Sequence, residues 1–247
     1  MTRRRLWKDR AALPDKYQAR LIRKESTALE TATFYFDKPA EFQFAAGQSI
    51  EVTLPTANLP EPDRVHTFSI CSAPYEDCLA ITTRLRDSPF KRALSLMKPN
   101  DGVEVAGPYG RFVVPQDTPR PVAFLAGGVG ITPAFSILKQ AARDSGLSGF
   151  YLFYSNRSRR EAPFLTELAQ LQSEDPEFHL IATMTADPSW TGEKERIGTE
   201  MIRRYIDPAR ASFFISGPPS MVTAMRDLLA GDGVLREQVR FESFSGY

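Results

Sequence analysis

The sequence predicts an all-β barrel domain followed by an α/β domain that contains a doubly wound parallel sheet. In the first half, short alternating and β-branched segments follow one another closely, with one helical segment among them. In the second half, apolar runs alternate with amphipathic helical segments, which is the pattern of parallel β–α units. The proline-rich segment 115–121 separates these two patterns. We therefore expect two domains joined by a short linker.

The expected barrel comprises residues 15–116 and follows a flexible basic N-terminus of residues 1–14. Its expected strands lie at residues 17–25, 31–39, 47–55, 66–74, 78–86 and 102–115. One helix is expected to begin after Ser88, a favoured N-cap residue, with Pro89 at the first helical position. Six strands at short intervals with a single helix are typical of a closed, six-stranded antiparallel barrel.

The expected α/β domain comprises residues 121–247, after a linker of residues 117–120. Its expected strands lie at residues 121–127, 149–156, 178–185, 211–217 and 238–244. Its expected helices lie at residues 133–146, 162–174, 198–206 and 219–233. Because strands and helices alternate at a regular period, we expect a doubly wound parallel sheet.

Composition argues against several classes of function. Lys plus Arg (31) nearly equals Asp plus Glu (30), so no global charge favours nucleic acid. Two cysteines, Cys71 and Cys78, and two histidines, His66 and His179, are too few for an iron–sulfur cluster or a multi-histidine metal centre. No apolar run approaches about 20 residues, and no secretory signal is visible. We expect a cytoplasmic protein with reduced thiols, no metal and no membrane span.

The segment "FLAGGVGITP" carries the most specific local signal. Gly127, Gly128 and Gly130 follow the first expected parallel strand and precede the first helix of the α/β domain. Glycine lets backbone N–H groups approach an anion at a helix N-terminus, which predicts a nucleotide-phosphate site. The spacing matches neither the Rossmann G-x-G-x-x-G nor the P-loop pattern. A glycine-eased turn without a ligand is the alternative.

Four motifs, taken together, resemble the ferredoxin–NADP⁺ reductase-like flavoproteins. "AGGVGITP" resembles the family's Gly-Gly-x-Gly-x-Thr-Pro loop, and "HTFSICSAP" resembles its Arg-x-Tyr-Ser flavin motif. "SGPPSM" resembles Cys-Gly-Pro-Pro-x-Met, and the chain ends in the aromatic-containing "RFESFSGY". The likeness covers nearly the whole chain and is greatest to bacterial FAD-dependent NAD(P)H oxidoreductases without an iron–sulfur domain. It implies a flavin-binding barrel and a nucleotide-binding α/β domain.

The resemblance implies where FAD would bind. The implied flavin-binding residues are His66, Thr67, Phe68, Ser69, Arg84, Ser88, Phe90, Lys91, Phe244 and Tyr247. His66 replaces the arginine that holds the flavin phosphates in most members, so Arg64 or Arg84 is expected to compensate. The family's pyrophosphate helix usually begins Gly-x-x-Ser, and this chain has Ser88 without the glycine. Phe244 and Tyr247 compete for the role of the aromatic that covers the flavin.

The resemblance also implies the site of NADP(H) or NAD(H). The implied residues are Gly127, Gly128, Gly130, Thr132, Ser155, Arg157, Arg159, Gly217, Pro218 and Met221. "YSNRSRRE" has serine and arginines where NADPH-using members hold the 2′-phosphate, and its first carboxylate is Glu161. We therefore expect a preference for NADPH. The alternative is that these arginines are merely solvated.

Four residues are implied to act in hydride transfer, namely Ser69, Ser216, Glu242 and Tyr247. Ser69 is expected to hydrogen-bond near flavin N5, and Ser216 replaces the family's cysteine beside the nicotinamide. Glu242 is expected to orient the nicotinamide or to assist proton movement, with a surface carboxylate as the alternative.

The resemblance implies a flavin-dependent oxidoreductase that passes a hydride from NAD(P)H to FAD and electrons to a separate acceptor. That acceptor is expected to be a ferredoxin, a flavodoxin or an oxygenase component. One alternative is a flavin or ferric reductase with a small-molecule acceptor. Another is a nucleotide-binding electron-transfer protein without turnover.

Overall fold

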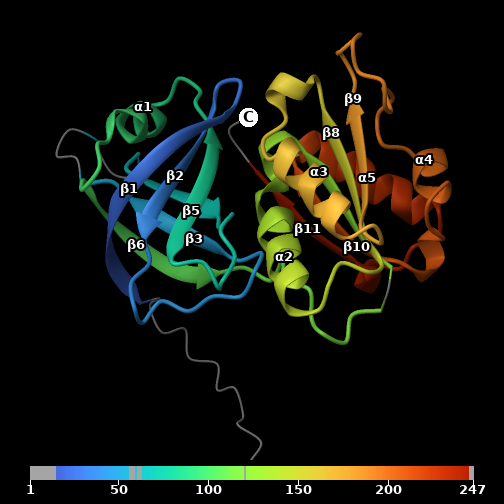
Figure 1. Ribbon diagram of the computed structural model, residues 1–247, viewed down its shortest axis with the longest axis horizontal. Helices are drawn as coiled ribbons and strands as arrows, with labels where there is room; N and C mark the ends of the chain where they lie inside the picture. Colours follow the sequence, from blue (N-terminus) through green and yellow to red (C-terminus); the bar gives the residue numbers. More distant parts are fainter. Residues whose placement is uncertain (1–14, 56–58, 60–62, 120, 245–247) are drawn as a thin grey trace, which may run out of the picture.

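The computed structural model describes residues 15–55, 59, 63–119 and 121–244, which form two sheets side by side (Figure 1). The first sheet is antiparallel and has six strands, and the second is parallel and has five. Both features agree with the fold class that the sequence predicts.

The antiparallel sheet closes on itself. In sheet order, its strands are β4 (Val65–Ser69), β3 (Ser49–Thr53), β6 (Gly102–Tyr109), β1 (Lys16–Ala28), β2 (Thr31–Asp37) and β5 (Cys78–Arg84). An antiparallel bridge between Ile70, directly after β4, and Ile81 in β5 joins the two ends of the sheet. Alternate residues such as Phe34 and Phe36 are completely buried inside. The result is the expected barrel.

The parallel sheet has helices on both faces. In sheet order, its strands are β11 (Val239–Ser243), β10 (Ser212–Gly217), β7 (Val122–Gly127), β8 (Phe150–Asn156) and β9 (His179–Met184). Helices α2 (Ile131–Asp144) and α3 (Leu165–Glu174) pack on one face, and α4 (Thr199–Arg203) and α5 (Pro219–Gly231) on the other. The strand order reverses between β7 and β10, and doubly wound sheets bind ligands at such a point.

Several predicted boundaries differ from the observed ones for local reasons. The helix expected at 162–174 begins only at Leu165, because Phe164 adopts a left-handed conformation with φ of +62°. The strand expected at 102–115 ends at Tyr109, where Gly110 turns the chain with φ of +92°. The helix expected at 198–206 is the short α4. Helix α1 (Pro89–Leu96) begins as predicted, with the Ser88 hydroxyl accepting from the backbone N–H of Lys91 at 3.2 Å.

Helix α2 joins the two domains and lies between the sheets in Figure 1. The buried Ser136 hydroxyl on α2 donates to the carbonyl of Ser72 at 2.6 Å, and Lys139 on α2 forms an ion pair with Glu76. Gly47 of the barrel, with φ of +94°, lies against α2, because a Cβ there would come within 2.8 Å of Cδ1 of Ile137. The domains therefore share a close-packed interface along α2.

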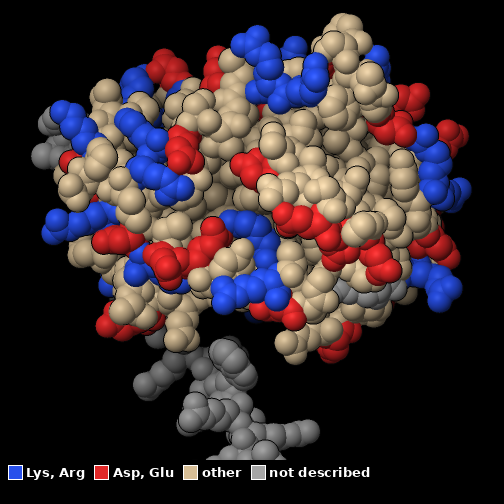
Figure 2. Space-filling view, viewed as in Figure 1, with Lys and Arg blue, Asp and Glu red and all other residues tan. Residues whose placement is uncertain are grey.

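Basic and acidic side chains are interspersed over the face shown in Figure 2. This distribution matches the nearly balanced charge of the sequence. No helix in the described part of the chain is both long and apolar enough to cross a membrane.

Candidate active site

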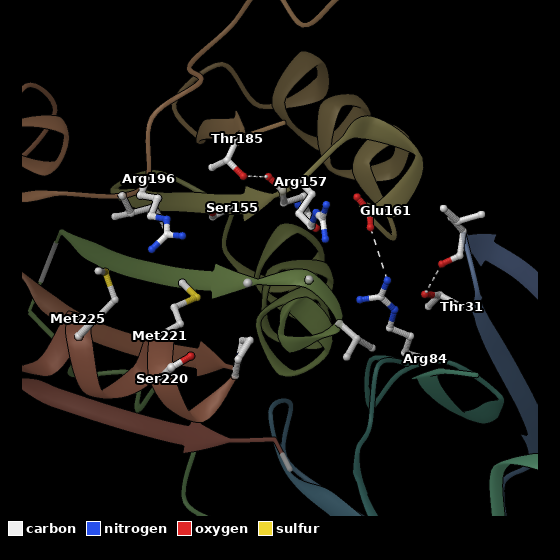
Figure 3. A pocket seen from close by; sticks show the side chains of 18 of the residues that line it. Thr31, Arg84, Ser155, Arg157, Glu161, Thr185, Arg196, Ser220, Met221 and Met225 are labelled. Atoms are coloured by element: carbon white, nitrogen blue, oxygen red, sulfur yellow. Dashed lines mark hydrogen bonds and ion pairs between the residues drawn. The ribbon is translucent and has the colours of Figure 1, made fainter. Parts of the chain in front are cut away.

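A cavity of about 490 Å³ opens between the two domains at the carboxyl ends of β7 and β8 (Figure 3). One wall comes from the α/β domain and the opposite wall from the ends of β2 and β5. Its lining includes Leu29, Thr31, Arg84, Arg86, Gly127, Gly128, Val129, Ser155, Asn156, Arg157, Glu161, Thr185, Arg196, Pro218, Ser220, Met221 and Met225. Both glycine-containing motifs of the sequence therefore meet at one cavity.

The glycine loop packs closely against the end of β10. After β7, a 3₁₀ turn, η1 (Gly128–Gly130), leads into α2. A Cβ on Gly130 would lie 2.5 Å from the carbonyl oxygen of Ser216 and 2.6 Å from Cα of Gly217. A Cβ on Gly127 would lie 2.4 Å from Sδ of Met221. These glycines let the ends of β7 and β10 lie close together beneath the cavity.

Thr132 and Ser216 lie behind this loop. The buried hydroxyl of Thr132 donates to the carbonyl of Val129 at 3.1 Å, so it holds the loop's own backbone. The Ser216 side chain is completely buried at the end of β10, and its hydroxyl has no hydrogen-bond partner among the described residues. Pro218 and Met221, by contrast, face the cavity.

A carboxylate and a hydroxyl meet where the barrel faces β11. The Ser69 hydroxyl, at the end of β4, donates to Oε2 of Glu242 at 3.3 Å. Burial raises the pKa of Glu242 to about 7, and the hydrogen bond from Ser69 offsets part of that rise. A Cβ on Gly110 would lie 3.2 Å from Oε1 of Glu242, so this glycine leaves room for the carboxyl group. A carboxyl with this pKa can hold or release a proton near neutral pH.

Known proteins resemble the chain in both domains. Residues 124–227 match the family model described as "Oxidoreductase NAD-binding domain". "Ferredoxin--NADP reductase B" of Sorangium cellulosum is 28% identical over 243 residues, which cover 93% of this chain and 98% of that protein. The chain belongs to the ferredoxin–NADP⁺ reductase-like family of FAD- and NAD-binding oxidoreductases.

Two further comparisons define the extent of this likeness. A solved ferredoxin NADP⁺ reductase from Neisseria gonorrhoeae, with bound FAD and NADP, has the same fold with a TM-score of 0.79. It is 22% identical, and the match covers 92% of this chain and 98% of that one. A component of the Na⁺-translocating NADH-quinone reductase of Pseudomonas aeruginosa is 34% identical over 158 residues, or 61% of this chain. The matched region spans only 39% of that component's length.

Aromatic rings gather where the resemblance implies the flavin, but two of the three lie inside the barrel. The rings of His66 and Phe90 lie 4.4 Å apart, and Phe68 lies 5.7 Å from Phe90. Phe68 and Phe90 are buried in the barrel core, whereas His66 and Thr67 are exposed. Desolvation by its neighbours, and then the charge of Lys91, lower the pKa of His66 although its side chain reaches the surface. His66 therefore offers a neutral imidazole where most family members have an arginine.

Cations gather beside His66 at the N-terminus of α1. Burial, and then the charges of Arg86 and Arg84, lower the pKa of Lys91. The backbone N–H of Lys91, one of the residues implied to bind the flavin, donates to the Ser88 hydroxyl and thus serves the helix cap. Clustered cations at a helix N-terminus fit a phosphate-bearing cofactor.

Arg84 lies in the wall of the cavity. Its Nη2 atom is 3.5 Å from Oε1 of Glu161 in the other domain and 3.6 Å from Oε2 of Glu30. The resemblance implies that Arg64 or Arg84 compensates for His66 at the flavin phosphates, and Arg84 lines the same cavity as the glycine loop.

Two arginines line the cavity on the side of the α/β domain, beyond the ends of β8 and β9. Arg157 and Arg196 both point into it in Figure 3, near Ser155 and Thr185. Neither arginine has a carboxylate within ion-pair distance among the described residues. Arg159, which the sequence assigns to this site, instead contacts Asp187 at 3.4 Å and Ser189 at 2.9 Å. The cavity thus contains Arg196, which sequence reasoning missed, and does not contain Arg159.

The two C-terminal aromatic candidates follow β11. The backbone N–H of Phe244 donates to the carbonyl of Gly217 at 3.0 Å, which fixes the end of β11 beside the second glycine motif. Tyr247 lies outside the described residues.

Across the described chain, no group of three potential ligands could hold a metal ion, and Cys71 and Cys78 are free thiols.

Proposed function

We propose that the protein is a flavin-dependent NAD(P)H oxidoreductase that transfers a hydride from NAD(P)H to bound FAD and passes electrons to a separate acceptor. The observation that carries this proposal is the meeting of the two glycine motifs with the barrel surface around one interdomain cavity. Family membership supports a site for two cofactors, because the family comprises FAD- and NAD-binding oxidoreductases. Bound FAD would supply the chemistry of accepting two electrons from a nicotinamide and releasing them singly.

The protein's own residues would position the cofactors and manage a proton. The loops around Gly127 and Pro218 would hold the nicotinamide half of the nucleotide against the barrel, where Ser69 and Glu242 lie. With a pKa of about 7, Glu242 would keep a proton on Oε1 or Oε2 below neutral pH while Ser69 orients the carboxyl group. His66 and the α1 N-terminus would bind the flavin phosphates.

We propose NADPH as the preferred coenzyme. Arg157 and Arg196 would bind its 2′-phosphate, since both face the cavity without a carboxylate partner in the described chain. Ser155 would add a hydroxyl donor from the end of β8. A hydrogen bond to a charged group contributes about 1.5–3 kcal/mol, so two such arginines would discriminate strongly against NADH.

We propose a separate redox protein as the electron acceptor. The name of the Sorangium relative, a ferredoxin–NADP reductase, supports a ferredoxin-type partner. The described chain has no cysteine cluster that could carry electrons internally.

The proposed function is tested by purifying the protein, supplying FAD and measuring NADPH oxidation with ferricyanide and with a ferredoxin. We expect FAD to remain bound through gel filtration and NADPH to be oxidised with ferricyanide. Faster turnover with ferredoxin than with ferric chelates or free flavin would support the protein acceptor, and the reverse would favour a small-molecule reductase. Failure to retain FAD, together with no NADPH oxidation, would reject the proposed function.

A further inference from the structure

An ion pair between two residues that line the cavity connects the two domains. Arg84, the last residue of β5, and Glu161, in the 3₁₀ turn η2 (Arg159–Glu161), point toward one another from opposite walls (Figure 3). A second contact joins the same two regions, because the backbone N–H of Leu29 donates to the carbonyl of Arg160 at 2.6 Å. The turn between β1 and β2 and the end of β5 are therefore both attached to η2 at one edge of the cavity.

The guanidinium of Arg84 is incompletely satisfied by its carboxylate partners. Its contacts to Glu161 and Glu30, at 3.5 and 3.6 Å, are longer than the 2.7–2.9 Å typical of charge-assisted hydrogen bonds. Its Nε is buried and has no hydrogen-bond partner among the described residues. The side chain is only 24% exposed, so water replaces few of its missing hydrogen bonds. Such a group retains donor capacity for a further anion in the cavity that it lines.

Glu161 places a negative charge in the same cavity. Its side chain is 19% exposed, lines the cavity, and accepts a hydrogen bond from the Ser158 hydroxyl at 3.1 Å. Glu30, the other partner of Arg84, is 62% exposed and does not line the cavity. Because like charges repel, the carboxylate of Glu161 opposes any phosphate that approaches Arg84.

We propose that Arg84 and Glu161 form a latch between the two domains, which the phosphates of the dinucleotide open by taking Arg84 away from Glu161. This inference rests on the proposed function in that it takes NAD(P)H as the ligand of the cavity. Glu161 then acts as a positioning residue: it holds the arginine at the cavity wall before the nucleotide arrives and competes with the nucleotide afterwards. The latch weakens coenzyme binding and favours its release.

The proposed latch predicts a different effect on nucleotide binding from that of an ion pair that only stabilises the domain interface. Removing the charge of Glu161 with the isosteric change Glu161→Gln frees Arg84 and removes a repulsive anion, so nucleotide binding becomes tighter. We expect NADP⁺ to bind about two- to fivefold more tightly, the range for loss of one competing, partly exposed ion pair. A contact that only held the domains together would give weaker binding when removed.

The test is calorimetric titration of the oxidised, FAD-loaded protein with NADP⁺. Glu161→Gln and Glu161→Ala are compared with Glu30→Gln, a matched control that removes the exposed partner of the same arginine. We expect both Glu161 variants to bind more tightly than wild type and Glu30→Gln to change affinity less than twofold. Equal or weaker binding by the folded Glu161 variants would overturn the latch while leaving the proposed function intact. Absence of NADP⁺ and NAD⁺ binding by the wild-type protein would overturn both.

Discussion

The hydroxyl of Ser69 in the barrel donates to the carboxyl group of Glu242 in the parallel sheet at 3.3 Å. These residues are 173 positions apart in the sequence, yet this contact joins the two domains at the proposed site of hydride transfer. Burial raises the pKa of Glu242 to about 7, so this contact joins a neutral hydroxyl to a group that titrates near physiological pH.

The raised pKa of Glu242 predicts a pH-dependent stability. The folded protein keeps this proton between its ordinary pKa of 4.5 and about 7, where the unfolded chain has lost it. Stability contributed by the protonated group is therefore present below about pH 4.5 and is lost as the pH rises through 7. Because glutamine does not titrate, we expect the unfolding free energy of Glu242→Gln, relative to that of wild type, to rise by about 1–2 kcal/mol from pH 5 to pH 8 in urea unfolding. An identical difference at both pH values would contradict the raised pKa.

Gly130 is predicted to be intolerant of any side chain. A Cβ there would lie 2.5 Å from the carbonyl oxygen of Ser216, so Gly130→Ala must separate β7 from β10. We expect a loss of about 1–3 kcal/mol in unfolding free energy and weaker nucleotide binding. Gly231→Ala is the matched control, since a Cβ at that position meets no atom within 4 Å. Equal stability of the two variants would show that the close approach does not exist in solution.

The cavity arginines predict how coenzyme preference responds to mutation. We expect Arg157→Met and Arg196→Met each to lower kcat/KM for NADPH about tenfold or more while changing that for NADH little, because only NADPH carries the 2′-phosphate. Arg159→Met is the control, because its guanidinium contacts Asp187 and Ser189 instead of the cavity. The assignment fails if Arg159→Met changes the NADPH preference as much as Arg196→Met does.

His66 predicts how tightly FAD is held. An arginine offers a permanently charged fork of donors, whereas His66 is a largely neutral imidazole because its pKa is lowered. We expect His66→Arg to strengthen FAD binding about tenfold and His66→Ala to weaken it, as measured by fluorescence titration of the apoprotein. Unchanged FAD affinity in both variants would remove His66 from the flavin site.

The sequence predicts the elements of this fold well because hydrophobic periodicity is a local property. The buried run of β7 and the amphipathic pattern of α2 are visible without tertiary information. The end of β6 at Gly110 and the late start of α3 after Phe164 depend on single residues with positive φ. Backbone angles of that kind are set by surrounding packing, which local patterns do not report.

The candidate site is only partly predictable, since its residues come from separate loops. The glycine motifs identify the ends of β7 and β10 from their residue types alone. The segment after β8 contains three arginines, and only the folded loop determines that Arg157 enters the cavity while Arg159 contacts Asp187. Arg196 lies in the loop after β9, where no local pattern marks it as a ligand.

The most direct test of the proposed function is anaerobic stopped-flow measurement of the FAD-loaded protein mixed with NADPH and, separately, with NADH. We expect the flavin absorbance near 450 nm to bleach rapidly with NADPH and much more slowly with NADH, which would demonstrate hydride transfer and the coenzyme preference together. A flavin spectrum that neither nucleotide changes, in protein that binds both FAD and NADP⁺, would contradict the central claim that this cavity brings the two cofactors together for hydride transfer.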